Sequence, residues 1–187
     1  NRAACLNMST GLWTAWNPNS GGTVKALVAS GSYIYLVGSF STIGGVAHSN
    51  IARVDPTPGA QDAPYAPSGA DGFPNDIIAD GSGNLYVCGN FTSYMGSTRE
   101  GIAQLNSSGA LTSWRLNDGG VRFATTASSE RLRLAGAGIW FTGTVRVLNF
   151  NGTDRMRGYG SANLTTGQVD QMVRVTSDFL NGLANLP

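Results

Sequence analysis

The stretch IYLVGSFSTIGGVAHSNIARVD, residues Ile34–Asp55, decides the fold because the chain repeats it without a gap as LYVCGNFTSYMGSTREGIAQLN, residues Leu85–Asn106. Each copy has a run rich in β-branched and aromatic residues, a Gly-x-Phe triplet, a Gly-containing turn and a second apolar run. The identical pairs are Tyr35/Tyr86, Gly38/Gly89, Phe40/Phe91, Gly45/Gly96, Ile51/Ile102 and Ala52/Ala103. The chain is therefore predicted to be a repeat protein.

A second match extends the repeat in both directions. Residues Gly11–Gly38 align without a gap with Gly109–Gly136, 98 positions later, and 11 of the 28 pairs are identical. The repeat unit is therefore 51 residues long the first time and 47 the second, which is 98 minus 51. Such a period is typical of β-propeller blades and of some solenoids.

Each unit is predicted to contain four short strands, with a tight hairpin between the second and the third. In the first unit the strands are expected at Leu12–Trp16, Val24–Ala29, Tyr33–Gly38 and Asn50–Asp55. The third unit departs from the pattern after Gly136. Further on, the stretch Gly167–Leu183 has apolar residues at spacings of three and four, which predicts a helix.

These patterns divide the chain into five parts. We expect an N-terminal extension at residues 1–10, repeat 1 at 11–55, repeat 2 at 56–106, a degenerate repeat 3 at 107–152, and a C-terminal segment at 153–187 that is part helical. Propellers close with about four or more blades, so three units form an incomplete ring. The chain is predicted to be part of a longer one, to borrow blades from other subunits, or to form an open array.

Composition supports an all-β fold and argues against two classes of partner. Gly accounts for 26 of 187 residues and charged residues for only 12%, as in proteins with many short strands and tight turns. The net charge of +1 comes from scattered single charges, so neither nucleic acid nor an anionic membrane surface is expected as a partner. No apolar run approaches the roughly 18 residues of a membrane span.

The first unit resembles the delta-60 type β-propeller repeat of large secreted and surface proteins of bacteria and of some phage structural proteins. The match is carried by Trp16, Gly38, Phe40, Gly44, Gly45, Ile51, Ala52 and Arg53. The second unit keeps Gly89, Phe91, Gly96, Ile102 and Ala103 but has Gln104 for the Arg, and the third keeps Trp114 and Gly136. The resemblance implies four-stranded blades with a structural or recognition role, and it supplies no catalytic motif.

Few residues of the sequence are candidates for a catalytic or a metal-binding role. His48 is the single histidine, in a Gly- and Ser-rich loop where Arg99 is its repeat equivalent, so we expect an exposed loop position. The carboxylates lie mostly in predicted turns, and no glycosidase-type pair can be selected. The segment Asp80–Asn84 superficially resembles a calcium loop, but a hairpin is expected there. We predict no cofactor and no metal site.

Two cysteines leave an alternative open. Cys88 takes the position of Val37 in a repeat strand, which predicts a buried side chain, while Cys5 lies near the start of the sequence. Both a Cys5–Cys88 disulfide and two free thiols are compatible with the sequence.

The leading functional hypothesis is a non-enzymatic structural or adhesive module on the outside of a cell or particle, with a phage virion or tail fibre component favoured. One alternative is a module that binds surface glycans or a receptor through loop aromatics such as Tyr65 and Tyr94. Another is a propeller-fold glycosidase-like enzyme, which would need an acidic cluster that the sequence does not reveal.

Overall fold

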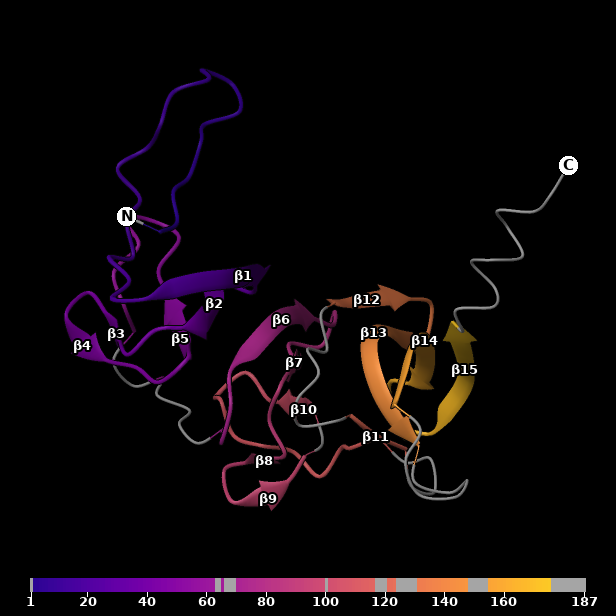
Figure 1. Ribbon diagram of the computed structural model, residues 1–187. Coiled ribbons are helices and arrows are strands. Elements are labelled where there is room, and N and C mark those ends of the chain that lie inside the picture. The colour runs from indigo at the N-terminus through magenta and orange to yellow at the C-terminus, as the bar shows by residue number, and fades with distance from the viewer. Residues whose placement is uncertain are drawn as a thin grey trace, which may run out of the picture.

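The computed structural model describes residues 2–62, 65, 70–99, 101–116, 121–123, 131–147 and 155–175. Within these residues the fold is all-β, and three antiparallel sheets follow one another in chain order (Figure 1). We call them blades 1, 2 and 3. The prediction of an all-β chain of propeller-type units is confirmed.

Blade 1 consists of β1 (Thr23–Ser30), β2 (Tyr33–Ser39) and β5 (Ile51–Val54), in the order β1-β2-β5. A small hairpin of β3 (Thr42–Ile43) and β4 (Val46–Ala47) projects between β2 and β5. Predicted strands two, three and four of the first unit agree with β1, β2 and β5 to within one residue at each end.

Blade 2 has the same plan. Its strands are β6 (Pro74–Ala79), β7 (Leu85–Gly89) and β10 (Ile102–Leu105), in the order β6-β7-β10. The hairpin between β7 and β10 consists of β8 (Ser93–Tyr94) and β9 (Ser97–Thr98).

The fourth strand of these two blades is reduced to a single bridge and follows the third strand instead of opening the unit. Val54 bridges Gln61 in blade 1, and Leu105 bridges Leu111 in blade 2. Backbone hydrogen bonds flank the first bridge, from Asp55 N to Ala60 O (2.8 Å) and from Asp62 N to Arg53 O (2.9 Å). The predicted opening strand Leu12–Trp16 is therefore wrong as a part of blade 1, because Trp13 bridges Leu6 on its N-terminal side.

Blade 3 has five strands: β11 (Val121–Phe123), β12 (Arg131–Ala135), β13 (Gly138–Val147), β14 (Arg155–Asn163) and β15 (Val169–Val175). The predicted boundary at residue 152 is not a structural one, since β13 pairs with β14 across it. The predicted helix is wrong for Val169–Val175, which form strand β15; the rest of that prediction, residues 176–187, lies outside the described residues.

The structure also corrects the alignment of the third unit. Gly136 does not occupy the place of Gly38; it lies in the β12–β13 turn with φ +59°, where Gly31 lies in the β1–β2 turn with φ +57°. The strand that corresponds to β2 is thus β13. Its residues Ile139–Gly143, sequence IWFTG, match Ile34–Gly38, sequence IYLVG.

Side chains alternate along the strands and so divide each sheet between two cores. Tyr35 and Val37 of β2 pack with Leu85 and Val87 of β7 in the core between blades 1 and 2. Leu36, which lies between the first two in sequence, points instead into a core on the opposite side of blade 1.

The same alternation builds the core between blades 2 and 3. Tyr86 and Cys88 of β7 pack there with Ile139 and Phe141 of β13. Blade 2 thus shares one apolar face with blade 1 and the other with blade 3. In the part of the chain that the structure describes, no helix is long and apolar enough to span a membrane.

Candidate functional site

The predicted structural repeat positions lie in these cores and turns. Trp16 and Trp114 are 5% and 7% exposed and belong to the outer core of blade 1 and to the core between blades 2 and 3. Tyr65 fills the corresponding place between blades 1 and 2. The remaining buried side chains of this set are Phe40, Ile51, Phe91 and Ile102.

The proposed ligand-loop aromatics are not available to a ligand. Tyr65 is fully buried and Tyr94 is 2% exposed, and burial raises the pKa of both phenols. The Tyr65 ring meets Tyr35 edge-on at 5.3 Å, and the Tyr94 ring meets Phe91 at 5.5 Å. The prediction that they bind a ligand in exposed loops is wrong, because both rings fill the core between blades 1 and 2.

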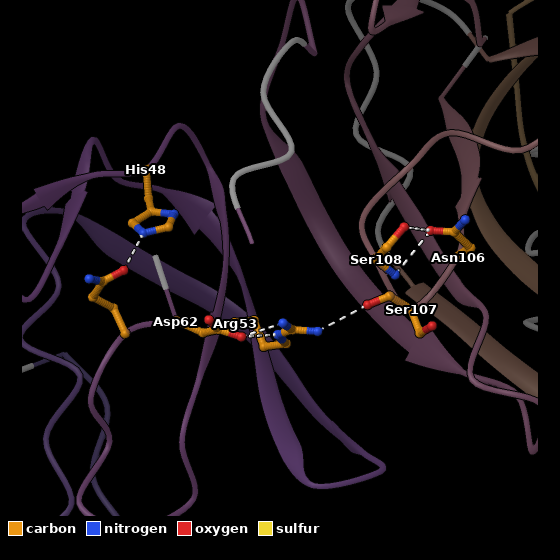
Figure 2. A network of polar contacts seen from close by, with 7 residues as sticks. His48, Arg53, Asp62, Asn106, Ser107 and Ser108 are labelled. Carbon is orange, nitrogen blue, oxygen red and sulfur yellow. Dashed lines mark hydrogen bonds and ion pairs between the residues drawn. The ribbon is translucent and has the colours of Figure 1, made fainter. Parts of the chain in front are cut away.

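His48 is buried, not exposed as predicted. Only 3% of it is accessible, and its Nε2 lies 3.0 Å from Gln61 Oε1 (Figure 2). Arg99, at the equivalent position of blade 2, donates from Nη2 to Thr112 O at 2.6 Å. Both side chains therefore tie the loop before the third strand to the outer strand, which is a structural task.

The Asp80–Asn84 segment forms the predicted hairpin. Asp80 Oδ1 accepts hydrogen bonds from the backbone N–H groups of Ser82 and Asn84, each at 2.9 Å, and Oδ2 accepts one from Asn84 Nδ2 at 2.8 Å. The carboxylate closes its own turn. No disulfide joins the two cysteines; Cys5 is exposed and Cys88 is buried.

A first cleft of about 500 Å³ opens between blades 1 and 2. Its lining includes the β1–β2 turn, Tyr33, Arg53 and the Ser107–Ser108 turn of blade 2. Figure 2 shows Arg53 reaching from blade 1 towards Ser107.

The Arg53 side chain crosses this cleft and links blade 1 to blade 2. Its Nε donates to Asp62 Oδ2 at 2.7 Å, Nη2 donates to the same carboxylate, and Nη1 donates to Ser107 O at 3.1 Å. The guanidinium lies over the rings of Tyr33 and Tyr65, 4.1 and 4.8 Å from their centroids. All three nitrogen atoms of the Arg53 guanidinium thus donate hydrogen bonds within the protein.

A second cleft of about 560 Å³ lies between blades 2 and 3 at the equivalent position. Thr112 Oγ1 donates to Gln104 Oε1 at 2.6 Å, Gln104 Nε2 donates to the Tyr86 hydroxyl at 2.6 Å, and that hydroxyl donates to Leu164 O at 3.2 Å. This chain of hydrogen bonds joins the two blades as Arg53 does in the first cleft. Burial raises the pKa of Tyr86, while the bond from Gln104 acts in the opposite direction.

Trp114 adds an unsatisfied donor to the wall of the second cleft. Its ring meets Tyr86 edge-on at 5.1 Å, and its buried Nε1 has no hydrogen-bond acceptor among the described residues. The equivalent Nε1 of Trp16 donates to Asp55 O at 3.1 Å. A buried N–H without an acceptor costs about 1–3 kcal/mol, so this position is one of local strain.

Sequence reasoning missed both clefts. The available signal was the pair Arg53 and Gln104, polar residues at the same place in two otherwise apolar third strands. A polar residue repeated at a core strand position indicates a specific partner, here across the interblade boundary.

Comparison with known proteins supports the repeat architecture. Residues 34–63 and 81–111 match the family described as a domain of unknown function (DUF5122) beta-propeller. These two stretches are thus similar to the repeats of a β-propeller family. Among solved structures, a computationally designed protein, Ika8, is similar with 12% identity and a TM-score of 0.40; the alignment covers 88% of this chain and 65% of that one. No curated protein shows significant similarity.

Proposed function

We propose that these β-propeller repeats form a non-enzymatic structural module of an extracellular assembly, with a phage virion or tail component as the favoured setting. The observation that carries the proposal is an exposed apolar surface on the N-terminal segment. Met8, Trp13 and Leu12 are 89%, 74% and 68% exposed. Large apolar side chains gathered on one projecting segment are typical of a protein-contact surface.

The clefts support a structural role in a second way. Their polar side chains hold neighbouring blades together: Arg53 bridges blades 1 and 2, and the Gln104–Tyr86 pair bridges blades 2 and 3. A side chain whose hydrogen bonds are engaged in the fold is not free to serve as acid, base or nucleophile. The extracellular setting is supported by the resemblance of the first unit to repeats of secreted, surface and phage structural proteins.

Immunogold electron microscopy of particles and cells from the source tests the setting. We expect antibody against the chain to label the outside of particles or cells. Label confined to the cell interior would overturn the proposal. A Trp13→Ser variant should be incorporated less, and Leu27→Ser is the matched control, since Leu27 is 51% exposed but lies on β1.

A second candidate function is the binding of a neutral saccharide in the second cleft. The exposed hydroxyl groups of Ser82, Ser113 and Thr165 line it, and hydroxyl groups are suited to hydrogen bonds with sugars. A glycan array probed with the intact chain tests it. Binding that is lost in Gln104→Leu and kept in Arg53→Gln would place the sugar in this cleft, whereas a blank array would exclude the function.

A further inference from the structure

The N-terminal segment Ala3–Thr14 forms a hairpin, which we call the N-terminal hairpin. Leu6 bridges Trp13, Asn7 N donates to Leu12 O at 2.9 Å, and Thr14 N donates to Cys5 O at 2.9 Å. In Figure 1 this segment is the indigo loop that projects from blade 1.

Its turn has the same hydrogen bonds as the turn that joins β14 to β15 in blade 3. Asn7 Oδ1 accepts from the N–H groups two and three residues later at 2.9 and 3.1 Å, and Asn163 Oδ1 does so at 2.9 and 3.0 Å. Gly11 N donates to Asn7 O at 2.8 Å with φ +68°, and Gly167 N donates to Asn163 O at 2.9 Å with φ +69°. The N-terminal hairpin thus has the geometry of the third and fourth strands of a blade.

Sequence register supports the same assignment. The segment Ala3–Asn7, sequence AACLN, aligns with Ile51–Asp55, sequence IARVD, and with Ile102–Asn106, sequence IAQLN. Ile51 and Ile102 each pack into the core towards the following blade. Ala3 does likewise, since it packs against the outer core of blade 1.

Among the described residues, no strand pairs with the other edge of the N-terminal hairpin. In blade 1 the residue equivalent to Leu6 is Val54, which pairs with Ile34 of β2, and in blade 3 it is Ala162, which pairs with Ile139 of β13. The N–H groups of Ala4 and Leu6 point to the edge where such a strand would lie, because backbone groups alternate along an antiparallel strand. Leu6 is 41% exposed.

An apolar side chain of blade 1 beside this edge is also incompletely covered. Ile34 is only half-buried, whereas its equivalents Leu85 and Ile139 are completely buried. Leu85 belongs to the core between blades 1 and 2, to which β1 and β2 contribute side chains such as Val28 and Tyr35. No first and second strands of a preceding blade cover Ile34 among the described residues.

We propose that the N-terminal hairpin is the outer half of a blade and binds a β-hairpin with the sequence pattern of the first two strands of this repeat. The second strand of that partner would pair with Ala3–Leu6 as β2 pairs with β5. Its counterparts of Tyr35 and Val37 would then cover Ile34, just as Tyr35 and Val37 share a core with Leu85 in the next interface. The inference rests on the proposed assembly function and names the kind of partner involved.

The test adds a peptide with the sequence of residues 23–40, TVKALVASGSYIYLVGSF, to the intact chain and follows amide hydrogen exchange. We expect exchange at Ala4 and Leu6 to slow by about tenfold or more, because their N–H groups gain acceptors. The matched control peptide carries Tyr35→Ser and Val37→Ser, which keep the backbone carbonyl acceptors but remove the side chains that would face blade 1.

Equal protection by both peptides would overturn the proposal, since it would show strand pairing that does not depend on the side chains that face blade 1. No protection by either peptide would overturn it as well. If the chain alone formed a dimer that protected Ala4 and Leu6, a second copy would be the occupant and the proposal would be wrong. None of these outcomes changes the immunogold result, so the two proposals fail separately.

Discussion

His48 Nε2 lies 3.0 Å from Gln61 Oε1, and this contact ties the loop after β4 to the outer strand of blade 1. The equivalent positions of blade 2 are joined by a different pair, Arg99 and Thr112. Both blades therefore keep a side-chain contact between this loop and the outer strand, although different residue types form the contact. The reduced fourth strand, which pairs through one bridge in blades 1 and 2, gains a side-chain anchor in this way.

Replacement of His48 by Ala should lower the free energy of unfolding by about 2 kcal/mol, because a buried ring and one hydrogen bond are lost. Chemical denaturation measures the change. The neighbouring exposed Ser49→Ala is the control and should be neutral. A neutral His48→Ala would show that the anchor does not contribute to stability.

Gly38→Ala and Gly89→Ala should each destabilise the chain by about 2 kcal/mol or more. A Cβ at Gly38 would lie 2.1 Å from Thr23 O, and one at Gly89 would lie 2.3 Å from Phe73 O, so backbone would have to move. The matched control is Gly81→Ala, which meets nothing within 4 Å. Equal thermal midpoints for all three variants would contradict the close strand approach.

Trp16→Phe should cost about 1 kcal/mol more than Trp114→Phe, although both residues fill equivalent gaps. The indole of Trp16 loses its bond to Asp55 O, whereas Trp114 Nε1 has no acceptor in the described part of the chain. Urea denaturation of the two variants compares them directly. A larger loss for Trp114→Phe would indicate that a buried water or ligand satisfies its N–H.

Asp71 should give the chain an acid-dependent stability. Slight desolvation raises the pKa of this exposed carboxyl, but hydrogen bonds from the Thr92 hydroxyl and from the N–H groups of Thr92 and Ser93 outweigh it and lower the pKa below the ordinary value of 3.8. A carboxylate with a depressed pKa stabilises the fold above its unfolded-state pKa, and that stability is lost as pH falls through the folded-state pKa.

Thermal midpoints of the native chain and of Asp71→Asn across acid pH measure this term. The native chain should be the more stable at neutral pH, and the difference should shrink below the ordinary pKa. A difference that stays constant with pH would show that the carboxylate charge plays no part.

Several elements followed directly from the repeat. Strands β2 and β7 were predictable because their apolar pattern occurs twice in one register, and Trp16 and Trp114 were recognisable as core aromatics by their fixed place in the unit. The same comparison, shifted to 105 positions, would have identified β13 from its IWFTG sequence. A longer connection before blade 3 hid this match.

Other features needed long-range contacts. Val169, Met172 and Val173 have helical spacing, yet they form β15 because β14 offers an edge to pair with, and pairing overrides a local pattern. The aromatic character of Tyr65 suggested a binding loop, but it takes the place that Trp16 has in the preceding gap. The burial of His48 depends on Gln61, which lies in the following outer strand.

The amino-acid sequence by itself determined the repeat, the all-β class and the residues that fill each blade, because apolar alternation and Gly positions are local and recur with the unit. Only the tertiary structure decided which blade each outer strand joins, how Arg53 and Gln104 bridge neighbouring blades, and that the N-terminal hairpin has an open edge. Those features depend on strand pairing and on contacts between separate units, and such contacts arise only when the sheets stack.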